Sequence, residues 1–482
     1  MKNFLRFKLT ALIRNVALLL AAGLTNAFAN TVIDCASPTS TTQTVQSSLT
    51  ECSIEGSTCE IPSGATCKVS GPLYMWGNAS LKSSNGGGIE FTLNPTTPNQ
   101  YPYLFNLGIS GPQIPVGSIS NLQNPFTGKI AGVTFKLTGT STDHGRIIYF
   151  WRTDGATVSN NVFDVGSFNY SATSSGNNQA WVHNSDINSV RRNVTISNNI
   201  INATSAGDAP LGSEGIGLGQ FTSATIQGNV IRGVGDDGIA LHFCSGVKIL
   251  DNVLETTRGR IFVGNSDHVE IARNMHTRIA SLKDNRFYGG MALLYVGFDD
   301  IYSGSLTNQW YAPSDIDIHH NELYYPSGSI DRGAAIYLYA PRKTTVKNNL
   351  IVNNSRNEAN TDAFVGLHLI PGDDYFKSAT GPTWIDPTGL DPKNIPRVHD
   401  VIIDTNVSIG DYPLALTMTG PLEGYAGPIT VSNNVGPAAG TTGTGSPGYQ
   451  FYYIGQFVTA KGNKALSSLP AAINLCPGPL YC

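Results

Sequence analysis

One short phrase recurs nine times along the 482-residue chain and restricts the fold more than any other feature. It reads "VSNNVF", "ISNNII", "IQGNVI" or "ILDNVL": an apolar residue, two variable residues, an asparagine, one more residue and usually a second apolar one. The aligned asparagines are Asn161, Asn199, Asn229, Asn252, Asn274, Asn321, Asn349, Asn406 and Asn434. Because Asn229, Asn252 and Asn274 follow one another at 23 and 22 residues, the chain contains a structural repeat of about that length.

The repeat predicts an all-β fold, a right-handed parallel β-helix solenoid. Apolar residues alternate with a period of two, which is typical of short strands. Strands at equivalent places in successive coils stack in parallel ~4.8 Å apart, so an asparagine at the same corner of every coil can hydrogen-bond to the next one. The 52 glycines suit tight corners. The same pattern predicts no amphipathic helix after the first 29 residues.

The ends of the chain differ in composition from this repeat. Residues 1–29 combine early Lys and Arg residues with the apolar run "VALLLAAGL" and a terminal "AFA", which is typical of a cleaved secretory signal. We therefore expect a secreted or periplasmic protein with no membrane segment after cleavage. We assign residues 30–125 to an N-terminal cap with the first coils, 126–436 to the parallel β-helix and 437–482 to a C-terminal cap.

The cysteines predict disulfide-stapled ends, because an exported protein can form such bonds. Cys35, Cys52, Cys59 and Cys67 would form two bridges at the N-terminal end, in a pairing that the sequence leaves open. Cys476 and Cys482 would form one bridge at the other end. Cys244 is left over, and we expect it to be a buried thiol, since no cationic neighbour in the sequence would activate it.

A second series of short strands predicts a surface that binds a ligand. If their aliphatic residues point inward, the period of two places the alternate residues outward. Aromatic rings and histidines on that outward stripe would bind sugar rings, with glycine and alanine between them. The stripe comprises Trp181, His183, Gly217, Gly219, Ala240, His242, Phe262, Gly264, Leu293, Tyr295, Tyr337, Tyr339, Gly366 and His368.

The turns that enter these strands carry the charged residues. Adjacent aspartates, as in "GVGDDGIALHF", raise each other's pKa and so suggest a cation, a shared proton or a turn cap. Two consecutive coils would bring Glu214, Asp236 and Asp237 together, provided that Gly235 and Gly238 allow the chain to bend. The cationic residues at equivalent turns are Arg258, Arg260 and Arg332.

At these residues the sequence resembles the polygalacturonase family of glycoside hydrolases, within the right-handed β-helix proteins of the pectin lyase-like superfamily. "GSEGIGLG", with Glu214, stands at the place of the family's Asn-Thr-Asp-Gly, and "GDDGIAL" matches Gly-Asp-Asp. "RGRIFVG" stands where the family has Gly-His-Gly, and "HTRI", with Arg278, stands where it has Arg-Ile-Lys. The resemblance spans roughly 60 residues.

The resemblance implies that Asp237 or Asp236 is a general acid and that the other carboxylates activate water for inverting hydrolysis of a glycosidic bond, without a cofactor. His242 or His183 would replace the missing histidine. We expect the substrate to be a polysaccharide that contains uronates. Nucleic acid is not an expected partner, because the net charge is −4 and the sequence has no basic run.

Two alternatives use the same residues differently. In a polysaccharide lyase or C5-epimerase, Glu214, Asp236 and Asp237 would bind calcium while Arg258 or Arg260 abstracts a proton and Tyr295 or His242 donates one. In a non-catalytic carbohydrate-binding or surface solenoid, the aspartates would only cap a turn.

Overall fold

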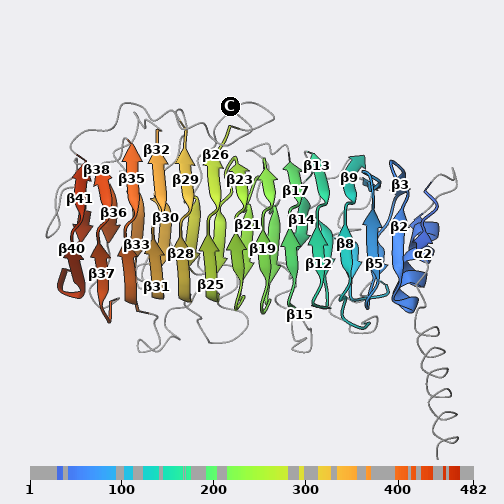
Figure 1. The fold of residues 1–482 in the computed structure, drawn as a ribbon, viewed down its shortest axis with the longest axis horizontal. Helices are drawn as coiled ribbons and strands as arrows, with labels where there is room; N and C mark the ends of the chain where they lie inside the picture. Colours follow the sequence, from blue (N-terminus) through green and yellow to red (C-terminus); the bar gives the residue numbers. More distant parts are fainter. Residues whose placement is uncertain are drawn as a thin grey trace, which may run out of the picture.

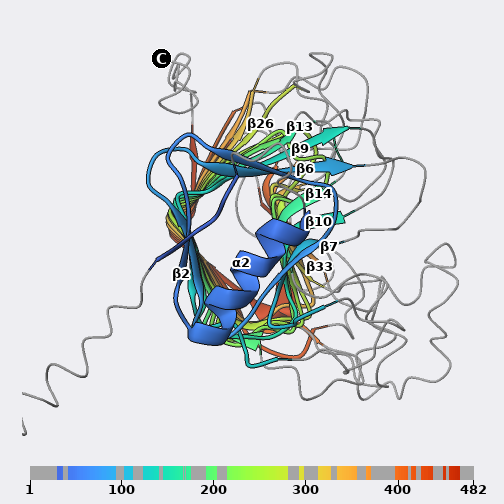
Figure 2. The same cartoon turned by 90° about the vertical axis from the view of Figure 1, so that its right-hand side faces the viewer.

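The computed structural model describes residues 30–35, 42–93, 103–111, 123–139, 145–166, 168, 170–174, 191–203, 214–280, 292–297, 313–326, 334–354, 365–370, 397–410, 414–418, 425–437, 449–451 and 455–466. They form one right-handed parallel β-helix, whose strands stack along the long axis in Figure 1. Figure 2 looks along this axis and shows three sheets around a common interior. The predicted fold class is therefore confirmed, whereas the predicted signal peptide, residues 1–29, lies outside the described residues.

The first sheet has fourteen strands. They are β1 (Thr31–Val32), β2 (Thr58–Ile61), β5 (Ser80–Ser83), β8 (Lys129–Ala131), β12 (Thr157–Ser159), β16 (Thr195–Ser197), β19 (Thr225–Gln227), β22 (Lys248–Leu250), β25 (Asp267–Ala272), β28 (Ser314–His319), β31 (Arg342–Lys347), β34 (His399–Asp404), β37 (Ile429–Ser432) and β40 (Val458–Lys461).

The second sheet has thirteen strands. They are β3 (Thr66–Val69), β6 (Gly88–Leu93), β9 (Thr134–Gly139), β13 (Val162–Gly166), β17 (Ile200–Ala203), β20 (Val230–Arg232), β23 (Val253–Thr256), β26 (Met275–Arg278), β29 (Glu322–Tyr325), β32 (Leu350–Asn353), β35 (Val407–Gly410), β38 (Val435–Pro437) and β41 (Lys464–Leu466).

The third sheet has twelve strands, and it carries the site described below. They are β4 (Leu73–Met75), β7 (Tyr103–Leu107), β10 (Gly145–Phe150), β14 (Tyr170–Ser174), β18 (Ile216–Gly219), β21 (Ile239–His242), β24 (Ile261–Gly264), β27 (Leu294–Gly297), β30 (Ala334–Tyr339), β33 (Val365–Ile370), β36 (Leu414–Met418) and β39 (Tyr449–Phe451). β11 (Thr153–Asp154) pairs with β15 (Arg191–Arg192) in a separate two-stranded sheet, and η5 (Gly455–Phe457) is a short 3-10 helix.

The predicted asparagine ladder runs along the corner between the first and second sheets. The Nδ2 group of Asn252, for example, donates to Oδ1 of Asn274 at 2.9 Å, and the same oxygen accepts from the backbone N–H of Asn252 at 3.0 Å. All nine predicted asparagines take part, and Asn463 extends the ladder by one rung. Each rung pairs polar groups that burial would otherwise leave unsatisfied, so the ladder fixes the register of successive coils.

The interior between the sheets is filled by rows of stacked aliphatic side chains. On the third sheet, one row is paired strand by strand. It consists of Ile216, Ile239, Ile261, Leu294, Ile336 and Leu367. These side chains are at most 3% exposed, and full burial of each contributes ~1.5–3 kcal/mol. Outward residues alternate with them, as the strand period predicts.

The N-terminal end is closed by α2 (Thr42–Glu55), which lies across the open coil in Figure 2. The expectation of no helix was therefore wrong. Val45, Leu49 and Cys52 bury one side of α2, and this contact with the first coil stabilises a helix otherwise rich in Ser, Thr and Gln. No helix among the described residues is long and apolar enough to cross a membrane.

The cysteines of the N-terminal end form two disulfides, as predicted. Cys35 pairs with Cys67, and Cys52 at the end of α2 pairs with Cys59 on β2. The predicted bridge between Cys476 and Cys482 lies outside the described residues and stays a prediction. Cys244 is a buried thiol whose pKa is raised by burial to about 11, so it is protonated at neutral pH.

The solenoid continues beyond residue 436, where we placed the start of the C-terminal cap. The strands β39, β40 and β41 each add to one of the three sheets. The rung at Asn463 lies in "AKGNKAL", where the small residues Ala460 and Ala465 stand at the two apolar positions of the phrase and make the repeat hard to recognise. Most of residues 456–465 in the last described coil are exposed, so polar side chains are tolerated there.

Candidate active site

Glu214 and Asp237 lie on consecutive coils at the entrance to the third sheet. Ile216 pairs with Ile239, so the register two residues earlier aligns Glu214 with Asp237. The backbone N–H of Gly215 donates to the carbonyl of Asp237 at 2.9 Å, which continues this alignment beyond the strands. Since neighbouring coils are ~4.8 Å apart, the two carboxylates belong to one small cluster.

Close packing of three consecutive turns brings the charged residues together. A Cβ atom on Gly238 would lie 2.6 Å from Cδ2 of Leu254, and one on Gly259 would overlap the carbonyl oxygen of Asp236. The N–H of Gly238 donates to the carbonyl of Arg260 at 2.9 Å. Glycine at 238 and 259 thus lets the turns before β18, β21 and β24 approach closely, as the bend predicted around "GDDG" requires.

Each of the two carboxylates faces a basic side chain. Nε of Arg260 donates to Oδ1 of Asp237 at 2.8 Å. Nε2 of His242 lies 3.7 Å from Oε1 of Glu214. Glu214 and Asp237 are 6% and 7% exposed, so both pairs lie where solvent screens charges weakly.

The pKa values of the two carboxyl groups shift in opposite directions. Burial acts to raise the pKa of Glu214, but the contact with His242 and the charge of Arg146 outweigh it, so the net shift is downward. Burial raises the pKa of Asp237 to about 7; Arg260 opposes this shift, whereas Asp236 and Glu214 add to it. At neutral pH the cluster therefore combines an ionised Glu214 with an Asp237 that is protonated in part of the molecules.

Asp236 is the third member of the cluster. Burial and the charge of Glu214 raise its pKa, and Arg260 partly opposes the shift. Burial alone would lower the pKa of Arg260, but Asp237, Tyr295 and Asp236 raise it. Arg260 therefore stays a guanidinium cation and is poorly suited to act as a base.

Aromatic rings hold Arg260 in place on the outer face of the third sheet. Its guanidinium carbon lies 4.6 Å from the ring centroid of Phe262 and 4.7 Å from that of Tyr295. Phe262 and Tyr295 stack on each other with centroids 5.3 Å apart. Because Arg260 covers these rings and Phe262 is 5% exposed, Phe262 supports the cation rather than a ligand.

The rest of the predicted stripe continues this row along the outer face. Tyr337 stacks on Tyr295 with ring centroids 5.6 Å apart, and it also contacts Tyr339 and His368. Burial lowers the pKa of His368 to about 4, so its imidazole is neutral at neutral pH. These rings come from β27, β30 and β33, so they extend away from the carboxylates by one coil at a time.

Other predicted site residues have different outcomes. Arg258 is half-buried in the turn before β24. Trp181, His183 and Arg332 lie outside the described residues. Leu293 was expected on the outward stripe, but this prediction is wrong: Leu293 is fully buried and belongs to the core. It precedes β27, so the alternation of that strand does not extend to it.

Arg146 was missed by the sequence interpretation. It lies on β10 and is 7% exposed, and its charge lowers the pKa of both Glu214 and Asp236. In register, Arg146 pairs with Ser171 on β14, the strand between β10 and β18. The available signal was its strand position two residues before Ile148, which is also where Glu214 stands relative to Ile216.

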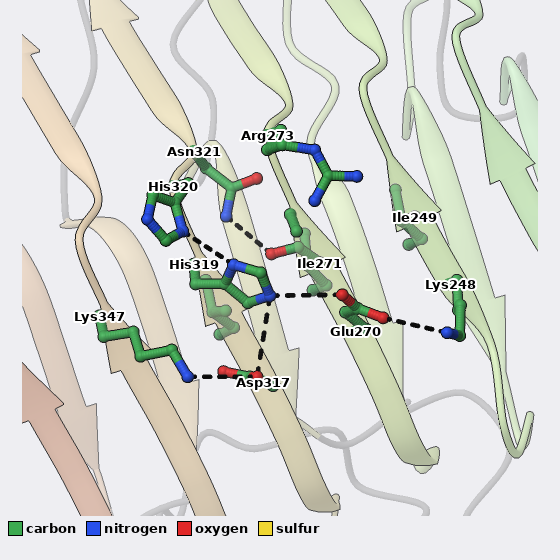
Figure 3. A network of polar contacts seen from close by, with 12 residues as sticks. Lys248, Ile249, Glu270, Ile271, Arg273, Asp317, His319, His320, Asn321 and Lys347 are labelled. Atoms are coloured by element: carbon green, nitrogen blue, oxygen red, sulfur yellow. Dashed lines mark hydrogen bonds and ion pairs between the residues drawn. The ribbon is translucent and has the colours of Figure 1, made fainter.

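A second polar cluster lies on the outer face of the first sheet (Figure 3). Nε2 of His319 lies 3.4 Å from Oε1 of Glu270 and 3.7 Å from Oδ2 of Asp317. Lys248 and Lys347 neutralise these two carboxylates from the neighbouring coils. Alternating charges across an exposed sheet account for this arrangement. Nowhere in the described parts of the chain could three or more His, Cys, Asp or Glu side chains hold a metal ion together.

Comparison with known proteins shows the fold. No family model matches the sequence, and no curated protein matches it. The A-module of the mannuronan C-5 epimerase AlgE6 from Azotobacter vinelandii superposes with a TM-score of 0.51 at 11% identity, covering 89% of this chain and 95% of that one. The catalytic unit of a GH87 α-1,3-glucanase from Streptomyces thermodiastaticus gives 0.52 at 11% identity, over 91% and 69%.

A protein of another class shares the fold equally well. PfbA, a surface adhesin of Streptococcus pneumoniae, superposes with a TM-score of 0.52 at 12% identity, covering 92% of this chain and 93% of that one. A hydrolase, an epimerase and an adhesin thus have the same right-handed parallel β-helix. An activity for this chain has to be argued from its own residues.

Proposed function

We propose that this protein is an exported enzyme that hydrolyses glycosidic bonds of a polysaccharide, with Asp237 as general acid and Glu214 as general base. The observation that carries the proposal is the opposite pKa shift of two carboxyl groups on consecutive coils. Glycoside hydrolysis needs one protonated and one ionised carboxyl group on either side of the scissile bond. Neighbouring groups whose pKa values are pushed apart meet this need.

In the proposed reaction, Asp237 transfers its proton to the glycosidic oxygen as the bond from that oxygen to the anomeric carbon breaks. A water molecule attacks the anomeric carbon from the other side, and its proton passes to Glu214, so that the configuration inverts. The charge of Arg260 stabilises the Asp237 carboxylate that results. Asp236 adds negative charge that favours the protonated form of Asp237 before the reaction.

The substrate is proposed to lie along the outer face of the third sheet. Tyr337, Tyr339 and His368 offer rings and polar tips to sugar units beyond the carboxylates. Arg146 supports a uronate-containing substrate: its Nε group is buried with no hydrogen-bond partner among the described residues, and a sugar carboxylate would complement it.

The elimination and epimerisation alternatives are supported less well. Their proton abstraction by Arg260 conflicts with its raised pKa. Their calcium ion would have to bind carboxylates that already face a guanidinium and an imidazole, and a second cation there would meet electrostatic repulsion. Tyr295 lies against Arg260 and His242 lies beside Glu214, so either could be the proton donor of these alternatives, and the experiment below includes their products.

The test is a screen of the secreted protein against acidic and neutral polysaccharides, with and without a chelator. New reducing ends without unsaturated products are expected, together with an inverted anomer in the first product. Unsaturated sugars would indicate a polysaccharide lyase instead of a hydrolase. A changed uronate configuration without cleavage would indicate a C5-epimerase. Binding without any product, unchanged in Asp237→Asn and Glu214→Gln variants, would support the non-catalytic solenoid.

A further inference from the structure

Two strongly polar side chains interrupt the apolar interior next to the proposed active site. His276 on β26 pairs in register with Leu254 and Leu323, which belong to the hydrophobic core. Arg278, two residues later, therefore shares the inward side of β26 and is fully buried. A solenoid interior normally contains stacked aliphatic residues at these positions, so a buried His and Arg indicate a specific task.

The hydrogen bonds of His276 determine its tautomer. Nδ1 lies 3.0 Å from the carbonyl oxygen of Leu293, so this nitrogen carries the proton and donates it. Burial lowers the pKa of His276 to about 3. Its other nitrogen, Nε2, lies 2.8 Å from the hydroxyl oxygen of Thr256. His276 therefore contacts the hydroxyl group that donates to the carbonyl of Gly259.

Thr256 and Arg278 both donate to the turn below the active site. The hydroxyl of Thr256 donates to the carbonyl oxygen of Gly259 at 2.8 Å. A guanidinium nitrogen of Arg278 donates to the same carbonyl at 2.9 Å. A buried carbonyl without a donor is costly, so Arg278 holds the peptide of Gly259 in its orientation.

That peptide connects directly to the proposed active site. Gly259 packs against the backbone of Asp236, where a Cβ atom would overlap the Asp236 carbonyl oxygen. The next residue is Arg260, whose own carbonyl accepts from the N–H of Gly238. A rotation of the Gly259 peptide would therefore displace the Arg260 side chain relative to Asp237.

We propose that His276 and Arg278 are positioning residues, which hold the Thr256 to Arg260 turn from inside the solenoid so that Arg260 stays against Asp237. The inference rests on the proposed function for its catalytic meaning, because Asp237 is the proposed acid. The groups that face Asp237 are Arg260, Asp236, Glu214 and His242. Of these, Arg260 is the one carried by the turn that Arg278 holds.

The test compares Arg278→Met, Arg278→Lys and His276→Leu with the parent protein. Met removes the charge at similar length, whereas Lys keeps the charge but lacks the planar guanidinium, whose Nη1 group reaches the carbonyl of Gly259 at 2.9 Å and the hydroxyl of Thr256 at 3.4 Å. Leu restores the aliphatic row and removes both hydrogen bonds of His276, but the carbonyl of Leu293 keeps the N–H of Ile261 as a donor, so the loss of stability should be small. Ile351→Val, in the same inward row on β32, is the matched control.

The main readout needs no substrate. For each protein, the thermal midpoint is measured against pH with and without the added Asp237→Asn change, and the difference reports the titration of Asp237. The pKa of Asp237 is expected to rise in all three variants, by about half a pH unit or more, because Arg260 no longer lowers it fully. In the control the titration should stay where it is in the parent.

Activity gives the second readout. On a cleaved polysaccharide, the three variants should lose about tenfold or more in kcat with a smaller change in KM, and the alkaline limb of the pH profile should move upward. An unmoved titration of Asp237 in His276→Leu and in the folded Arg278 variants would overturn the proposal. It would be overturned equally if Arg278→Lys matched the parent, since charge alone would then be sufficient. A shifted titration in a protein that cleaves no polysaccharide would sustain the positioning role and reject the hydrolase.

Discussion

The guanidinium of Arg260 donates a 2.8 Å hydrogen bond to the carboxylate of Asp237, a residue 23 positions earlier that lies on the preceding coil. One coil of the solenoid separates them in sequence, and the parallel register brings them into contact. The pair is nearly buried, and the raised pKa of Asp237 despite its cation makes this carboxyl group the centre of the predictions that follow.

Asp237→Asn should lower turnover by about 10² or more while leaving the thermal midpoint unchanged or higher. An amide still accepts the hydrogen bond of a turn cap, but it supplies no proton. Asp251→Asn is the control. Asp251 is a half-exposed residue at the corner between the first and second sheets, where it pairs with Arg273. Initial rates and thermal midpoints of both variants would be measured; full activity in Asp237→Asn would return Asp237 to a turn-capping role.

The rate should depend on pH in a bell shape. Because the acid must be protonated, kcat/KM should fall as pH rises through about 7, the pKa of Asp237. Because Glu214 must be ionised to act as the base, the midpoint of the acid limb should lie below the usual pKa range of a glutamate. Arg146→Met should move only this acid limb upward, since the charge of Arg146 lowers the pKa of Glu214. An acid limb that stays in place would remove Arg146 from the site.

Stability should decline between weakly acidic and neutral pH because of Asp237. Its pKa is raised on folding from 3.8 to about 7, so the folded state binds the proton more tightly than the unfolded state. Its contribution is fully present below pH 3.8 and is lost as pH rises to about 7, at up to about 1.4 kcal/mol per pH unit. Denaturant titrations at several pH values should show that Asp237→Asn abolishes this part of the decline. Equal slopes in both proteins would contradict the raised pKa.

Asn252→Ala should destabilise the protein by about 2–4 kcal/mol, because the buried N–H of Asn229 loses its acceptor and the carbonyl of Ile226 loses a donor. Asn463→Ala provides the comparison within the same ladder, since Asn463 is half-buried on the last described rung and should cost less. Free energies of unfolding from denaturant titration would test this. Similar costs at both positions would show that the ladder does not depend on burial.

The sequence was sufficient to predict the solenoid because every coil has to satisfy the same buried polar groups at the same corner. Asparagine therefore recurs from Asn161 to Asn434, and all nine of these residues are found in the ladder. The outward stripe followed from strand alternation, which correctly placed His242, Tyr295, Tyr337 and His368. Alternation stops where a strand ends, and for this reason it failed at Leu293.

The helix α2 could not be predicted in the same way. Its three buried apolar residues form a weak pattern, and the helix is stabilised by contact with the open end of a solenoid that the local sequence does not describe. The last coil was missed for a related reason, since its exposed position permits Ala460 where the inner coils bury a larger apolar residue such as Val431.

The membership of the carboxylate cluster was determined by the sequence, because one coil length separates Glu214 from Asp236 and Asp237. The roles within it were decided by the tertiary structure. Which carboxyl group is protonated depends on burial and on the side chains that approach it: Arg260 and His242 from adjacent coils, and Arg146 from two strands away. Electrostatic free energies depend strongly on these distances, and the distances are set by side-chain packing. The spacing of residues along the sequence contains no information about that packing.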